Sequence, residues 1–162
     1  MLNAKVNQLL NNQVQHEFES AYQYLEISNY FEAAGLDGFA CWFLKQSREE
    51  ISHGLKIIHY LLNWGNNLSM QDIHAANRSY QDYVEPLKDA LDHEKKITQD
   101  INAIVKAAKD NDDYRTLEFI RWFINEQSEE EETAQKLLDS MVRFGLSDEG
   151  LFQIDKKAGK RE

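Results

Sequence analysis

The stretch Ser47-Arg48-Glu49-Glu50-Ile51-Ser52-His53 lies in the middle of an apolar pattern that decides the fold. Members of this pattern recur at alternating spacings of four and three residues: Phe39, Phe43, Gln46, Glu50, His53, Ile57, Tyr60 and Trp64. Such spacing predicts the buried face of a packed helix. Glu50 and His53 lie one turn apart on this face, where burial of an unpaired charge is very costly. Glu-x-x-His on one buried helical face therefore indicates a pair of metal ligands.

The composition favours one helical domain and excludes several classes of partner. A chain of 162 residues is long enough for a substantial core, and seven glycines with one proline favour long helices. The single cysteine, Cys41, rules out an internal disulfide and indicates a reducing compartment, where we expect it to be buried. The net charge of −10 argues against a nucleic-acid partner. The N-terminus lacks a signal-peptide core and no apolar run is long enough to span a membrane, so we expect a cytoplasmic protein with no membrane partner.

Three other apolar patterns predict three further long helices, which together make an all-α four-helix bundle. We expect the four helices over residues 3–33, 37–64, about 82 to 109, and 114–144, and a short fifth helix over about 147–158 capped by Ser147. The bundle then covers about 3–144 of a single domain, 1–162. The short turn at Gly35–Gly38 makes the first two helices antiparallel. Residues 65–81 lack a period and are long enough to cross the whole bundle, so helices two and three should be parallel.

Each predicted helix carries polar residues at the same depth of its apolar face. These residues are Glu17 on the first helix, Glu50 and His53 on the second, Glu94 on the third, and Gln127 and Glu130 on the fourth. Buried together without a cation, the carboxylates would repel and their pKa values would rise until most were neutral. Two metal ions would neutralise them, and a carboxylate-rich site without thiolates suits iron or manganese.

The pattern matches the di-iron carboxylate arrangement of four-helix bundles, in which two helices give Glu and two give Glu-x-x-His. Here Gln127-x-x-Glu130 stands where the second Glu-x-x-His would be. The first metal position would have Glu50 and His53 with Glu17, and the second would have Glu50 with the acidic groups of helices three and four. A second position with fewer ligands suits a site that must release its oxidised product.

The sequence resembles the bacterial non-haem ferritins, of the ferritin-like di-iron family, over nearly its whole length. The resemblance rests on the Glu17 to Tyr24 spacing and on four motifs, which are 49–53, His93-Glu94, 122–130 and 150–156. It implies a ferroxidase that oxidises Fe(II) with dioxygen or hydrogen peroxide at a di-iron centre, without haem. It also implies a homo-oligomeric shell of 24 subunits that stores ferric mineral.

The resemblance also implies a role for individual residues. Iron at the first position would be bound by Glu17, Glu50 and His53, and iron at the second by Glu94 and Glu130. Gln127 would hydrogen-bond to bound oxygen or water, and Tyr24, with Trp122 near it, would be a candidate electron donor beside the centre. The alternative for both aromatic residues is core packing, which we expect for Trp122. Residues resembling the acidic cluster of a third iron site are Glu49, Glu126 and Glu129.

One departure from the family concerns the iron entry pore. Leu117 and Ile120 stand where animal heavy-chain ferritins have acidic residues lining the three-fold pores. Two alternatives remain: a haem-binding bacterioferritin, and a metal-free helical interaction bundle. The first would need a Glu-x-x-His motif in the fourth helix and a Met in the middle of the second, and the chain has neither. The remaining histidines are predicted to be structural or exposed: His16, His59, His74 and His93.

Overall fold

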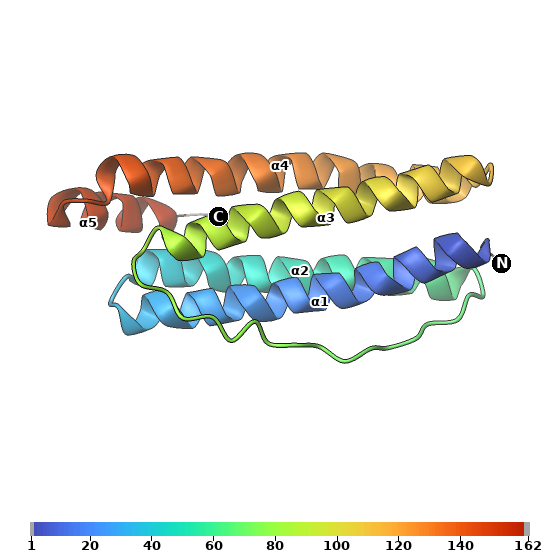
Figure 1. Ribbon diagram of the computed structural model, residues 1–162, viewed down its shortest axis with the longest axis horizontal. Coiled ribbons are helices and arrows are strands. Elements are labelled where there is room, and N and C mark those ends of the chain that lie inside the picture. Colours follow the sequence, from blue (N-terminus) through green and yellow to red (C-terminus); the bar gives the residue numbers. More distant parts are fainter. Residues whose placement is uncertain (1, 161–162) are drawn as a thin grey trace.

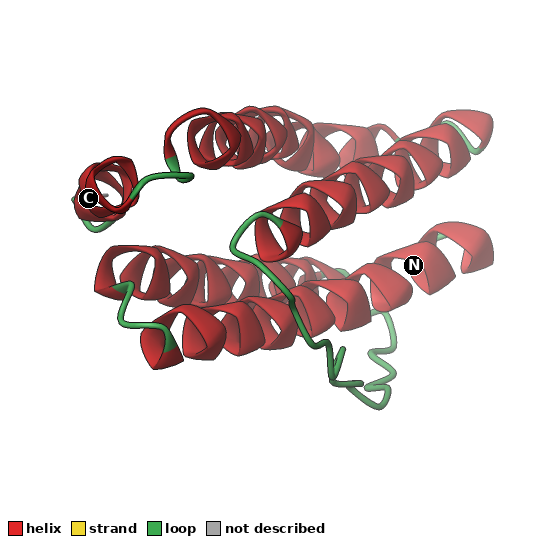
Figure 2. Ribbon diagram, turned by 60° about the vertical axis from the view of Figure 1, so that its left-hand side comes forward, coloured by secondary structure: helices red, strands yellow, loops and turns green. Residues whose placement is uncertain are grey.

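The computed structural model describes residues 2–160, which form five α-helices and no strand (Figures 1 and 2). The helices are α1 (Ala4–Ala33), α2 (Asp37–Asn63), α3 (Glu85–Asp110), α4 (Tyr114–Phe144) and α5 (Asp148–Ala158). The predicted all-α bundle with a short fifth helix is confirmed. No helix in the described part of the chain is long and apolar enough to cross a membrane.

The connections arrange the helices as the sequence predicts. α1 and α2 form one antiparallel pair and α3 and α4 another (Figure 1). Residues 64–84 join the pairs without helix or strand and run along α1 for most of the bundle's length. The Asn11 side chain holds this crossover, since its amide donates to the Asn67 carbonyl and its oxygen accepts from the Ser69 N–H. The crossover makes α2 and α3 parallel.

Local capping groups set where the helices begin and end. Ser147 accepts from the Gly150 N–H at the start of α5, as predicted. α3 begins at Glu85, three residues later than expected, because Asp82 accepts from the N–H groups of Val84 and Glu85 and holds a turn there. At the end of α2, Gly65 has a φ of +64°, a left-handed conformation that favours glycine. Trp64 therefore lies beyond the helix and is 44% exposed, so it is not a core residue.

Two apolar clusters fill the bundle, one at each end. The first contains Leu10, Ile57 and Ile101, and the second contains Phe31, Phe39 and Leu87. The buried polar residues predicted to bind metal lie in the layer between the two clusters. Cys41 was expected in the core but is exposed, because it lies nine residues before Glu50 and so on the opposite side of α2.

α5 packs against the ends of α2 and α4, where it caps α2. The N-terminus of α2 has no side-chain cap of its own, and the Phe39 N–H donates to the Asp155 Oδ1 of α5 at 2.9 Å. A Cβ at Gly38 would lie 1.8 Å from the Asp155 carbonyl oxygen, so only glycine permits this approach. These contacts fix α5 against the bundle.

Candidate metal centre

All six residues predicted from the helix patterns to form the metal site are buried in one polar layer. Their exposed fractions are 1% for Glu17, 3% for Glu50 and Glu94, 6% for His53, 8% for Gln127 and 7% for Glu130. They come from all four long helices, and each lies in the buried face of its helix, where the neighbouring residues are mostly apolar. Matched burial on four helices brings the polar groups to one level of the core.

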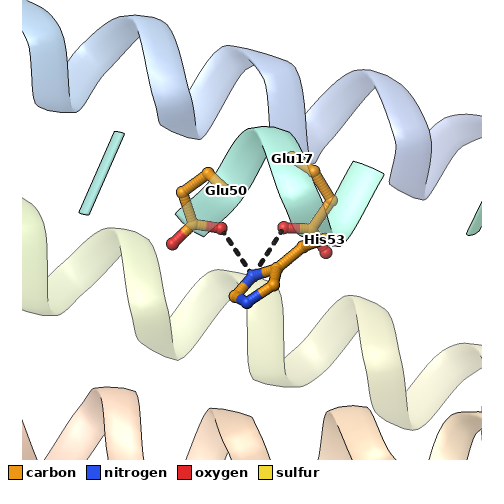
Figure 3. A group of neighbouring side chains, drawn as sticks. All are labelled: Glu17, Glu50 and His53. Carbon is orange, nitrogen blue, oxygen red and sulfur yellow. Dashed lines mark hydrogen bonds and ion pairs between the residues drawn. The ribbon is translucent and has the colours of Figure 1, made fainter. Parts of the chain in front are cut away.

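The first group of candidate ligands consists of Glu17, Glu50 and His53 (Figure 3). The His53 Nδ1 lies 3.0 Å from the Glu50 Oε2 and 3.8 Å from the Glu17 Oε2. One ligand atom of each residue lies within 4.8 Å of the others, close enough to hold one ion. This is the set that the sequence predicts for the first metal position.

A second group joins α2 to α4 and shares the same histidine. Ligand atoms of His53, Glu126 and Glu130 lie within 4.8 Å of one another, and the His53 Nε2 is 3.9 Å from the Glu126 Oε1. Within residues 2–160, these two groups are the sets of three ligands found at that spacing, and Glu94 belongs to neither. The sequence predicts Glu94 at the second position, whereas the structure directs its carboxylate to Tyr24 and Gln127.

Neutral hydrogen-bond donors hold all four carboxyl groups of the layer. The Tyr24 hydroxyl and the Gln127 amide donate to the two oxygens of Glu94. Gln46 donates to the Glu50 Oε1 at 3.1 Å and to the Glu130 Oε2 at 2.7 Å, which links α2 to α4. Buried polar groups need such partners, so these donors fix the carboxylates before any ion arrives.

Gln13 completes this set, since it donates to the Glu17 Oε1 at 2.9 Å and is 1% exposed. The sequence pattern predicts Gln46 in the buried face of its helix but assigns neither Gln13 nor Gln46 to the metal site. The spacing was a signal for both, because each glutamine stands one helical turn before a candidate ligand, at 13 and 17 and at 46 and 50.

The pKa values show how the layer tolerates four carboxyl groups. Burial and the nearby charge of Glu50 raise the pKa of Glu94 to about 8 and that of Glu130 to about 7. Burial likewise raises the pKa of Glu17 well above its ordinary value. Burial alone would also raise the pKa of Glu50, but the hydrogen bond and charge of His53 outweigh it and lower the value. The layer thus keeps one ionic pair, Glu50 with His53, beside carboxyls that tend to stay protonated.

Comparisons with known proteins show which family the chain belongs to. The ferritin-like domain model matches residues 7–144, which is most of the chain. The chain belongs to the ferritin family. A bacterial non-heme ferritin of Staphylococcus aureus (strain USA300) is 30% identical over 99% of this chain and 97% of its own length. A bacterial non-heme ferritin of Staphylococcus haemolyticus is 31% identical over the same shares.

Solved ferritin structures have the same fold. An open pore ferritin from the archaeon Archaeoglobus fulgidus superposes with a TM-score of 0.97 and 27% identity, covering 100% of both chains. A closed form of the Archaeoglobus fulgidus ferritin, engineered by site-directed mutagenesis, gives a TM-score of 0.96. This ferritin chain therefore matches its structural relatives from end to end, including α5.

The acidic residues predicted to form a third iron site lie at the edge of the centre. Glu49 and Glu126 are half-buried, and Glu129 is exposed. Of the three, Glu126 joins a compact group of ligands, with His53 and Glu130. A third site in this ferritin built from Glu49, Glu126 and Glu129 stays a prediction.

The two aromatic residues predicted beside the centre lie in different places. Tyr24 is buried and donates to Glu94, and burial with the charge of Glu94 raises its pKa well above its ordinary value. Trp122 packs edge-on against His53 at 5.3 Å, and Lys56 lies 3.6 Å from the centre of its ring. The tryptophan of this ferritin thus contacts His53 from α4, while the tyrosine contacts the carboxylate of Glu94.

The other histidines of this ferritin are structural or exposed, as predicted. Partners from other parts of the chain contact three of them: His16 lies 3.0 Å from Asp100, His74 lies 3.2 Å from Glu19, and the His93 ring contacts the Ser20 hydroxyl. The fourth, His59, is exposed.

Of the two positions predicted to match pore residues, Leu117 and Ile120, the second does not lie at a pore. Ile120 is 0% exposed and packs in the first apolar cluster, so it lines the bundle core and no pore. Leu117 is half-buried. The helical period of α4 explains this, since Ile120 lies in the same face as Phe123 and Gln127.

Proposed function

We propose that this ferritin is a ferroxidase that oxidises Fe(II) at the buried layer and stores the ferric product. The observation that carries the proposal is the compact ligand group of Glu17, Glu50 and His53, with the carboxyl groups of Glu94 and Glu130 beside it in the same buried layer, which offers two adjacent iron positions. Two iron ions at such adjacent positions can each give one electron to one oxidant. Dioxygen takes two electrons and two protons to become hydrogen peroxide, and hydrogen peroxide takes two of each to become water.

The residues of the centre divide into two iron positions. Glu17, Glu50 and His53 would bind the first iron, since they already lie within bonding reach of one ion. Glu130 with Glu94 would bind the second, once the Glu94 carboxylate turns from the Gln127 amide. Neutral carboxyls must lose protons to bind a cation, so iron binding releases protons from this layer. Fewer committed ligands at the second position favour release of the ferric product.

We infer a homo-oligomeric shell, with 24 subunits as the family resemblance implies. Support comes from large apolar side chains that the isolated subunit leaves exposed on α1, α2 and the crossover: Tyr22, Leu25, Ile51, Leu55, Leu62 and Met70. A further group at the α4–α5 junction includes Phe144, Leu146 and Phe152, which are 52%, 89% and 62% exposed. Exposed apolar side chains of this size, where they gather into one patch, mark protein interfaces. We place the protein in the cytoplasm, where its exposed free Cys41 would stay reduced.

Anaerobic titration followed by rapid mixing with oxidant tests the function. We expect binding of two Fe(II) per subunit, then fast oxidation on mixing with dioxygen. Glu130→Ala should lose the second Fe(II) and the fast phase, whereas Glu118→Ala, at an exposed carboxylate of α4, should change neither. Absence of Fe(II) binding by the wild type would overturn the proposal. A haem absorption band in the purified protein would favour the bacterioferritin alternative.

A further inference from the structure

A polar groove lies between α3 and α4 and leads toward the proposed second iron position. Its lining residues all belong to these two helices, and the polar ones are Thr98, Asn102, Gln127, Ser128 and Glu131. About 210 Å³ of the groove is open to the centre of a water-sized molecule. A single water needs only roughly 10–15 Å³ by this measure. The groove therefore has room for a cation together with its bound waters.

Gln127 forms the inner end of this groove. It is 8% exposed, and its amide nitrogen donates to the Glu94 Oε2 at 2.6 Å and to the Glu94 main-chain carbonyl at 3.0 Å. Within residues 2–160 its Oε1 has no hydrogen-bond donor, so this oxygen can accept from a water or bind a cation. Gln127 thus contacts both the groove and the Glu94 carboxylate, and a change of its rotamer joins the two.

Glu131 gives the groove a negative wall. The Thr98 hydroxyl donates to the Glu131 Oε1, which holds the carboxylate at the surface of the groove. Among residues 2–160, no lysine, arginine or histidine lines the groove. A recess lined by one sign of charge raises the local concentration of the opposite ion, and carboxylate, amide and water oxygens are ligands for hard divalent cations. The groove therefore suits a hydrated divalent cation.

The α2–α4 side of the centre is less open to a cation. There Trp122 packs edge-on against His53, with 5.3 Å between the ring centroids, and the Lys56 Nζ lies 3.6 Å from the centre of the indole. Glu126 is on this side too, but its carboxylate already faces the His53 Nε2 at 3.9 Å. An indole and a positive charge thus cover His53, whereas neither occurs on the described lining of the groove.

We propose that the groove is the entry route of Fe(II) to the second iron position, with Glu131 as the carboxylate that first binds the hydrated ion. The inference rests on the proposed ferroxidase function and names the path that its metal substrate takes. The ion exchanges some of its waters for oxygens of Glu131 and Gln127. It then passes to Glu94 and Glu130 as the Gln127 amide turns away from Glu94.

Anaerobic mixing of the assembled shell with Co(II) alone tests the route without oxidation, because bound cobalt is followed by its visible absorption. The wild type should take up two Co(II) per subunit. Glu131→Gln keeps the shape of the side chain and removes its charge, so the second uptake should slow by about fivefold at low salt. The equilibrium stoichiometry should stay at two, and the difference in rate should shrink as salt is added.

The matched control is Glu132→Gln, which makes the same change at the next residue. Glu132 is an exposed carboxylate that pairs with Lys136 and does not line the groove. Its substitution changes the net charge by the same amount, so it should leave the second uptake near the wild-type rate. Equal slowing in Glu132→Gln and Glu131→Gln would overturn the route, because net charge alone would then explain the effect.

A second variant blocks the groove without a change of charge. Ser128→Trp adds an indole at an exposed lining residue, and Asn125→Trp adds one at an exposed residue of α4 outside the groove. The second uptake should slow in Ser128→Trp and not in Asn125→Trp. An unchanged rate in either Ser128→Trp or Glu131→Gln would overturn the proposed route while the wild type still binds two ions. Failure of the wild type to take up two ions would instead overturn the ferroxidase proposal, and the route with it.

Discussion

Replacing Glu94 with glutamine should change how the stability of the metal-free protein depends on pH. Burial, followed by the charges of Glu50 and Glu130, raises the pKa of Glu94 from 4.5 to about 8. When the pKa of a carboxyl is higher in the folded than in the unfolded state, its contribution to stability is complete below pH 4.5. That contribution is lost as the pH rises through about 8. Glutamine resembles the protonated form and cannot ionise, so the variant avoids this loss.

The size of the effect follows from the displacement of the pKa. Each pH unit of displacement is worth ~1.4 kcal/mol, which gives a ceiling of about 5 kcal/mol for Glu94. We expect Glu94→Gln to gain on the order of 2 kcal/mol over wild type between about pH 5.5 and 8.5, since ionisation of Glu130 absorbs part of the relief. Glu94→Leu is a weaker test, because it leaves the Tyr24 hydroxyl without an acceptor, while the Gln127 amide keeps only the main-chain carbonyl of residue 94. Each lost acceptor costs ~1–3 kcal/mol.

Urea unfolding followed by circular dichroism, with a chelator present, measures this difference at each pH. The control is Glu118→Gln, which makes the same chemical change at an exposed carboxylate of α4 and should follow the wild type at every pH. The reasoning would be refuted if the free energy of unfolding of Glu94→Gln fell with rising pH as steeply as that of the wild type. A large loss in the variant at every pH would show that Glu94 has a charged partner that the contacts described above do not include.

Three further changes test the site and the fold. His53→Ala removes the ligand shared by both groups, so stopped-flow mixing should show no fast oxidation; initial rates near wild type would contradict its role. Because Glu94 and Glu130 must ionise, anaerobic metal binding near pH 7 should release protons and strengthen as the pH rises to about 8. Calorimetry in buffers of different ionisation enthalpy measures this, and identical heats would exclude proton release. Asp155→Ala should cost ~0.5–2 kcal/mol through loss of the α2 cap, seen as faster hydrogen exchange over residues 148–158; unchanged exchange would show that packing alone holds α5.

The sequence by itself determined the four helices, their order and the residues of the polar layer. Periodicity is a local property of one helix, so each apolar face could be read without knowing its neighbours. A polar residue within such a face, as at Glu17 or Glu94, marks a buried group that needs compensation. The length of residues 65–81 then predicted a crossover, because a segment of that length without helical period can span the bundle from one end to the other.

Only the tertiary structure decided which of those groups meet. Distances between helices depend on how each helix is rotated about its axis and on side-chain rotamers, neither of which the spacing of residues along one helix reports. Glu94 turns to Tyr24 and Gln127, and Trp122 packs on His53, for this reason. The cap that Asp155 gives to Phe39 joins residues 116 positions apart, and its strength comes from the unsatisfied N–H groups at a helix start. Such contacts exist only once the chain has folded.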